Sequence, residues 1–90
     1  MTDLNRDVIA TAIIEAVHRR GPDKTLCPSE VARALAPDTW RDLMGDIRAV
    51  ATELASNGLI TIRQGGVVQD PSLELKGPIR LGGPTAMPDA

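Results

Sequence analysis

The chain has 90 residues, which are enough for one domain and too few for two. Trp40 is its only residue of the Phe, Tyr and Trp class, so it lacks the exposed rings on which single-strand nucleic-acid binders stack bases. The formal net charge of −2 counts against strong nonspecific binding to DNA or RNA, because neutralised phosphates supply most of that binding free energy.

Cysteine usage and the first residues bear on the cellular compartment. Cys27 is the only cysteine, so neither an intramolecular disulfide nor a cysteine-based metal cluster can form. The first residues lack the basic start and the apolar run of a signal peptide, and no stretch approaches the roughly 18 apolar residues of a membrane span. We therefore expect a cytoplasmic protein with no membrane segment and no cofactor.

One helix is predicted at the start of the chain, from about Leu4 to Arg20. Asp3 or Asn5 can cap its N-terminus, and Gly21-Pro22 ends it. The apolar residues repeat with helical spacing and would form one buried stripe, made of Val8, Ile9, Ala12, Ile13, Ala16 and Val17.

A short strand and two further helices are predicted next. Lys24–Leu26 is a short extended segment, and residues 28–36 have the initial proline and the early acid of a helix start. Asp38 can cap a third helix that begins near Thr39 and ends at Asn57-Gly58. The inward positions of this third helix are predicted to be Trp40, Leu43, Met44, Ile47, Val50, Ala51 and Leu54.

The rest of the chain predicts a β-hairpin. Residues 59–64 alternate apolar and polar side chains, Gly65-Gly66 provides a two-residue turn, and residues 67–70 return. The segment Lys76–Leu81 is expected either to add an edge strand or to lie across the core.

The order of elements predicts an α+β fold that is mainly α-helical with a small β-hairpin. A long helix, a short helix, a turn and a third helix form a helix-turn-helix, and the glycine-tipped hairpin after them is the wing. The sequence therefore predicts a winged helix-turn-helix of three helices and a two- or three-stranded wing. We expect this domain to span residues 3–81 and residues 82–90 to form a flexible tail.

Short motifs occur along the chain in a distinctive order. They are Pro28-Ser29-Glu30-Val31-Ala32-Arg33, Trp40, Arg48 with Ala51 and Leu54, Gly58, Gln64-Gly65, and Lys76-Gly77-Pro78-Ile79-Arg80. This series, within roughly residues 9–81, resembles a bacterial family of short uncharacterised proteins, domain of unknown function 3253. The resemblance implies a winged-helix-like fold and no established activity, so it brings no catalytic or binding residues to this chain.

The residues that catalysis or metal binding would need are sparse. The only histidine, His18, is predicted at the end of the first helix, and Cys27 at the start of the second. No spacing places the two beside an orienting third group, so structural roles are the expectation for both. Asp38, Asp42 and Asp46 follow one helix face, which we interpret as a solvated acidic surface. We therefore expect neither an enzyme nor a metal-binding protein.

Binding to double-stranded DNA is one function that the predicted fold favours. In helix-turn-helix proteins the second helix of the motif enters the major groove, and a wing reaches the neighbouring backbone. Polar positions on the third helix and the wing would then contact DNA, with Gly45 allowing close approach. The candidate contact residues are Arg33, Arg41, Arg48, Thr52, Arg63 and Gln64.

Acidic residues near these candidates leave a second function open. Asp42, Asp46 and Glu53 would lie beside the basic stripe, and Arg41 can pair with Asp38 rather than with DNA. Winged helices also serve as docking units, so the alternative is a protein-protein interaction or homodimerisation module without nucleic-acid binding.

Three further features each have two interpretations. Trp40 is either a core anchor between the second and third helices or a binding hot spot. Ile14 either widens the core-facing stripe or extends an interface. Lys76–Arg80 either clasps an anion or forms a turn that docks Ile79 and Leu81 onto the core.

Overall fold

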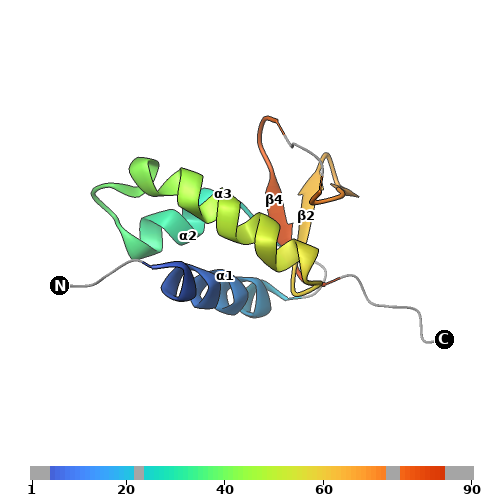
Figure 1. The fold of residues 1–90 in the computed structure, drawn as a ribbon, viewed down its shortest axis with the longest axis horizontal. Coiled ribbons are helices and arrows are strands. Elements are labelled where there is room, and N and C mark those ends of the chain that lie inside the picture. The colour runs from blue at the N-terminus through green and yellow to red at the C-terminus, as the bar shows by residue number, and fades with distance from the viewer. Residues whose placement is uncertain (1–4, 22–23, 73–75, 85–90) are drawn as a thin grey trace.

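The computed structural model of the chain describes residues 5–21, 24–72 and 76–84. Its elements are α1 (Arg6–Arg20), β1 (Thr25–Leu26), α2 (Pro28–Leu35), α3 (Trp40–Ser56), β2 (Thr61–Gln64), β3 (Val67–Val68) and β4 (Arg80–Gly82). Figure 1 shows β2 and β4 beside the C-terminal part of α3, with α1 lying along the other side of that helix. The described residues therefore confirm the predicted class, three helices with a small antiparallel sheet, in a layout consistent with a winged helix.

α1 begins where the sequence supplies a cap. The Asn5 Oδ1 atom accepts a hydrogen bond from the Val8 N–H at 3.0 Å, so Asn5 is the N-cap, and Asp3 lies outside the described residues. At the other end the N–H of Gly21, whose φ is +101°, donates to the Val17 carbonyl at 3.2 Å. The fully buried positions of the predicted stripe are Ile9, Ile13 and Val17.

The turn between α2 and α3 differs by one residue from the prediction. The Asp42 N–H donates to the Thr39 carbonyl at 3.0 Å, so Thr39 and not Asp38 is the N-cap of α3. The Thr39 N–H itself donates to the Ala36 carbonyl at 3.1 Å. The residues after α2 thus complete one further turn before α3 starts, which moves the helix start past Asp38.

The C-terminus of α3 is closed by glycine, as predicted. Gly58 has a φ of +77°, and its N–H donates to the Ala55 carbonyl at 3.0 Å. The next N–H, of Leu59, reaches back to the Leu54 carbonyl at 3.0 Å. These paired bonds form a Schellman motif, which requires a residue that tolerates positive φ at the position of Gly58.

The sheet holds β4 in a place other than the edge position that the sequence suggested as one alternative. Its order is β1-β4-β2-β3, with every neighbouring pair antiparallel, so β4 is a central strand and not an edge strand. The Gly65-Gly66 turn, with φ of +58° and +81°, folds β3 onto one edge of β2. The chain then returns along the other edge of β2 as β4, and β1 covers the far side of β4. The predicted two- or three-stranded wing is therefore part of a four-stranded sheet.

The sheet and the helices share one core. Leu81 on β4 lies between its register partners Leu26 on β1 and Ile62 on β2, and all three side chains are fully buried. The remaining core positions come from all three helices and from the segments beside β2 and β4. Within the described residues, none of the helices has the length and apolar character needed to cross a membrane.

One polar residue of β2 is buried, against the expected alternation. Thr61 is only 7% exposed, because its hydroxyl donates to the Gly83 carbonyl at 2.8 Å and so replaces the bonds that water would make. Gly82 belongs to β4 and Gly83 is buried, so both residues pack with the sheet. Residues 85–90 of the predicted tail lie outside the described residues.

Truncation of Leu81 tests the central position of β4. We expect Leu81→Ala to lower the free energy of unfolding by about 3 kcal/mol, because it opens a cavity in a closed core. Leu59→Ala, at a position that is 48% exposed, removes the same atoms and should cost less than about 1 kcal/mol. Urea denaturation of both variants measures the two losses. Equal losses would contradict the strand order described here.

Candidate nucleic-acid interface

The six residues predicted to contact DNA lie in three separate places. Arg33 and Arg41 meet at the turn between α2 and α3. A second group lies between α3 and the loop before β4, and one residue is on the far face of the sheet. The second group is Arg48, Thr52 and Gln64, and the isolated residue is Arg63.

Two arginines stack on the only tryptophan. The Cζ atom of Arg33, from α2, is 4.3 Å from the centroid of the Trp40 ring, and that of Arg41, from α3, is 4.8 Å away. Trp40 is half-buried and packs against the core, so it gives the two mobile side chains a fixed platform. Sequence reasoning named all three residues but did not join them. The available signal was their short separation in sequence, since Arg33 is in the last turn of α2 and Trp40 begins α3.

Neither stacked arginine is part of an ion pair within the described part of the chain. The ion pairs found there join Arg6 to Glu53 and Arg20 to Glu30. The pairing of Arg41 with Asp38 that the sequence allowed is not among them. Stacking uses the face of a guanidinium group, so the N–H donors in its plane remain suited to phosphate or carboxylate oxygens.

The second group holds the chain's own backbone. Arg48 donates from Nη1 to the Gly77 carbonyl at 3.1 Å, and Gln64 donates from Nε2 to the carbonyls of Lys76 at 2.7 Å and Pro78 at 3.4 Å. We call this arrangement the loop clasp. Thr52 donates to the Arg48 carbonyl at 2.9 Å, one turn back along α3. Arg48 and Gln64 thus tie α3 and β2 to the loop that leads into β4, whereas the Thr52 bond stays within α3.

Arg63 is separated from α3 by the sheet. Successive strand residues point to opposite faces, and because Ile62 faces the core, Arg63 faces outward. Its Nε donates to the Thr61 hydroxyl at 3.2 Å, and its register partner on β4 is Arg80. Arg63 therefore cannot share one surface with the polar stripe of α3, contrary to the arrangement expected from the sequence.

The exposed side of α3 has two edges of opposite charge. Asp42, Asp46 and Glu53 follow one edge at helical spacing, and the ion pair of Glu53 with Arg6 turns this edge toward α1. The bond from Arg48 to Gly77 turns the other edge toward the loop clasp. Between the edges lie exposed residues with small side chains or none, namely Gly45, Ala49 and Ser56.

The model of one protein family, described as a protein of unknown function (DUF3253), matches residues 6–84 and so spans nearly all of the chain. The chain belongs to this family. No curated protein matches the DUF3253 chain significantly.

The loop clasp explains why the motifs of this DUF3253 chain lie far apart in sequence. Arg48, Gln64 and the Lys76-Gly77-Pro78 turn come from three segments and meet at one place. Gly77 has a φ of +82°, which a side chain would strain, and this conformation turns its carbonyl within reach of Arg48. These motif residues therefore tie α3, β2 and the loop together, and the loop residues themselves stay exposed. Of the two interpretations of Lys76–Arg80, the structure confirms the fixed turn, since Ile79 and Leu81 are buried.

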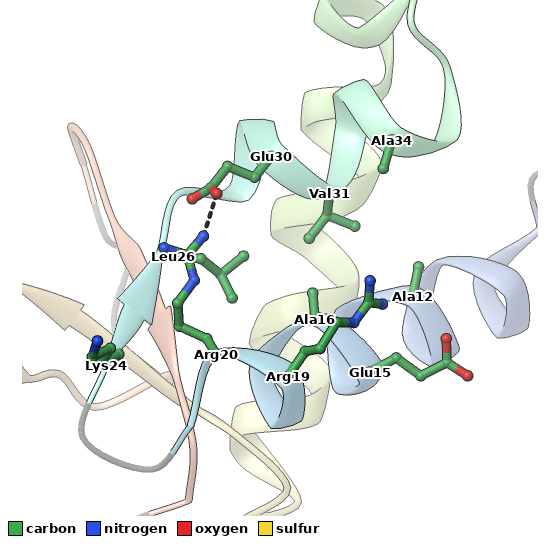
Figure 2. Close-up of a pocket in the computed structure, with 10 residues that line it drawn as sticks. All are labelled: Ala12, Glu15, Ala16, Arg19, Arg20, Lys24, Leu26, Glu30, Val31 and Ala34. Carbon is green, nitrogen blue, oxygen red and sulfur yellow. Dashed lines mark hydrogen bonds and ion pairs between the residues drawn. The ribbon is translucent and has the colours of Figure 1, made fainter.

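A second surface feature of the DUF3253 domain is a groove between α1 and α2 (Figure 2). One hollow of this groove has a volume of about 430 Å³ and has Leu26 and Val31 in its lining. Arg20 of α1 and Glu30 of α2 pair at one end of the groove, and Figure 2 shows Arg19 on the α1 wall. This groove joins apolar and charged side chains and lies away from Trp40.

The side chains considered for catalysis stay apart. Cys27 is half-buried at the start of α2 and accepts a hydrogen bond from the Ser29 hydroxyl at 3.1 Å, whereas His18 is exposed at the end of α1. Over residues 5–21, 24–72 and 76–84, no three His, Cys, Asp or Glu side chains converge as a group that could hold a metal ion.

Removal of the loop clasp should show coupling between its two side chains. Arg48→Ala and Gln64→Ala are each expected to cost about 1 kcal/mol of unfolding free energy, since each loses hydrogen bonds to the same loop. The double variant should cost less than the sum, because the first loss already frees the loop. Urea denaturation of the single and double variants gives the coupling. The control pair, Gln64→Ala with Asp46→Ala, should be additive, and additivity of both pairs would contradict the clasp.

The start of α2 should make stability depend on pH. The Cys27 N–H, which donates to Glu30 Oε2 at 2.9 Å, lowers the pKa of the Glu30 carboxyl below its usual 4.5, and the Arg20 guanidinium lowers this pKa further. Because the pKa of Glu30 is lower in the folded chain than in the unfolded chain, its ionised carboxylate stabilises the fold at pH values above the unfolded-state pKa. This stabilisation is lost as the pH falls through the folded-state pKa.

We expect Glu30→Gln to lower stability by about 0.3–1 kcal/mol at neutral pH, because the amide oxygen can still accept from the Cys27 N–H but the charge that favours the start of α2 and pairs with Arg20 is lost. The difference from the unmodified chain should shrink below about pH 4.5, where the native carboxyl also becomes protonated. Thermal denaturation across this pH range measures it. Glu15→Gln on α1 is the matched control, and an equal pH-dependent effect there would contradict the role of the Cys27 contact.

Proposed function

We propose that this domain is a non-catalytic module that binds double-stranded DNA through the turn between α2 and α3. The observation that carries the proposal is the stack of Arg33 and Arg41 on Trp40. It lies at the N-terminal end of the second helix of the helix-turn-helix layout. In DNA-binding proteins of this layout, the residues at that end contact base edges while the preceding helix crosses the backbone.

The stack favours binding because it limits the side-chain conformational entropy that the two arginines lose when they contact DNA. A free arginine side chain carries roughly 2 kcal/mol of rotamer entropy, part of which it gives up when it is fixed. Arg33 and Arg41 already rest on a ring that the core holds in place, so their planar forks are partly oriented. Such forks match two oxygens of a phosphate, or the O6 and N7 atoms of guanine.

The shape and charge of α3 support the same face. Gly45, Ala49 and Ser56 leave the middle of its exposed surface without large side chains, which allows the helix backbone to approach a groove closely. The acidic edge is turned toward α1 and away from the loop clasp, where Lys76 adds an exposed cation. This division reduces the repulsion that Asp42 and Asp46 would otherwise exert on phosphates.

The number of cations limits the affinity. Arg33, Arg41 and Lys76 supply about three phosphate contacts, which correspond to a slope near −2.7 in a plot of log affinity against log salt. Affinity should then fall about 40-fold between 50 and 200 mM salt, as this slope implies. We therefore propose an accessory DNA contact that acts together with other binding, and not a repressor-like domain that binds tightly on its own.

A titration with duplex DNA tests the proposal. We expect a fluorescein-labelled random duplex of about 20 base pairs to bind at about 50 mM salt, where electrostatic binding is strong. Arg33→Ala with Arg41→Ala should weaken binding at least about tenfold and reduce the salt slope by about 2. Fluorescence anisotropy measures both quantities. The emission of Trp40, the only tryptophan, should also change in the unmodified protein, because the DNA would cover its ring.

The matched control removes two cations elsewhere. Arg19→Ala with Lys24→Ala changes the net charge equally, at the end of α1 and just before β1, and leaves the Arg6–Glu53 ion pair intact. It should retain most of the affinity and the salt slope. Absence of binding at low salt would refute DNA binding. An equal loss in the control, or an unchanged Trp40 emission, would refute the site, and melting curves exclude unfolding as the cause.

A further inference from the structure

The groove between α1 and α2 extends along most of α1. A second hollow of about 410 Å³ shares Ala12 and Glu15 with the first, so the two hollows lie next to each other along α1. Together their linings run from Asp7 near the start of α1 to Arg19 near its end. The twelve residue steps between these two positions correspond to roughly 18 Å, which is enough to hold about three turns of another helix.

The lining of the groove suits a packed helix. The apolar residues that the two helices give to its lining are Val8, Ala12 and Ala16 on the α1 side and Val31, Ala34 and Leu35 on the α2 side, and Thr11 is an uncharged polar residue among them. The alanines keep the walls low, which allows two helix backbones to approach closely. Val31 belongs to the core, whereas Val8, Ala34 and Leu35 keep part of their surface exposed, so a partner that covers these three would gain the free energy of removing that surface from water.

The charges along the groove have a direction. Asp7 lies at the end formed by the start of α1, whereas Arg19 and Lys24 lie at the opposite end. Glu15 lies between, and Arg20 is already paired with Glu30. A partner helix must therefore place a cation at the Asp7 end and an anion at the Arg19 end.

α1 itself has this arrangement when it is reversed. We propose that the groove binds α1 of a second copy of this chain in antiparallel orientation, around a two-fold axis. Asp7 of each copy then lies beside Arg19 of the other, and the helix dipoles run in opposite directions. A parallel copy would instead place Asp7 beside Asp7. The interface is the same on both copies, as a two-fold dimer requires. This inference does not depend on DNA binding.

A pair of charge-reversal variants tests this dimer. We expect the unmodified chain to show a reversible monomer–dimer equilibrium between about 1 µM and 1 mM, as measured by sedimentation equilibrium. Asp7→Arg and Arg19→Asp should each weaken self-association about tenfold or more, because each places like charges opposite one another. A mixture of the two variants should recover dimers, since every contact in the mixed dimer joins an arginine to an aspartate.

A steric pair of variants provides the second arm. Ala34→Arg fills the groove from an exposed position of α2 and should abolish dimers without unfolding the domain. Ala49→Arg makes the same change on the exposed surface of α3 and should leave self-association intact. A chain that stays monomeric to 1 mM would overturn the proposal, as would dimers in Ala34→Arg or no preference for the mixed charge-reversal dimer.

Discussion

The insertion of β4 between β1 and β2 is the constraint on which the other features depend. Leu81 lies between Leu26 and Ile62, so one buried side chain ties a strand near the start of the domain to a strand near its end. The path to that position sets the loop before β4 against α3, where Arg48 and Gln64 bind its carbonyls. The loop in turn fixes which edge of α3 faces the sheet. The orientation of the polar surface of α3 thus follows from the pairing of a three-residue strand.

Patterns of short range were enough to predict the helices and the hairpin. Helical spacing located the buried faces of α1 and α3, and the glycines at residues 58, 65 and 66 adopt the positive φ that their turns need. The place of β4 was not predictable in the same way. Its three residues, Arg80–Gly82, have little pattern of their own, and their position depends on pairing with residues more than fifty positions earlier. Thr61 shows the same limit, because the acceptor that makes its burial favourable is Gly83.

The candidate site shows what residue type alone cannot establish. Arginine and glutamine at exposed positions of a helix and a hairpin suggested one DNA-facing surface. Successive residues of β2 point to opposite faces of the sheet, so Arg63 lies on the outer face and Gln64 on the side of the loop before β4. A long polar side chain can serve the chain's own carbonyls as readily as a ligand, and only the position of the carbonyls decides between these uses. Trp40 shows the opposite case, since a half-buried ring gathers Arg33 and Arg41 into one group.

The pairing of Thr25 with Gly82 also has a consequence for how the domain acquires its structure. Contacts between residues close in sequence can form early, whereas contacts that close a long loop carry a larger entropic cost and form more slowly. α1, α2 and α3 can therefore assemble while a ribosome is still adding residues, but the centre of the sheet cannot. Until Arg80–Gly82 emerges, β1 and β2 each expose an unpaired edge. The chain is consequently most open to unwanted strand pairing in the period before β4 takes its place between them.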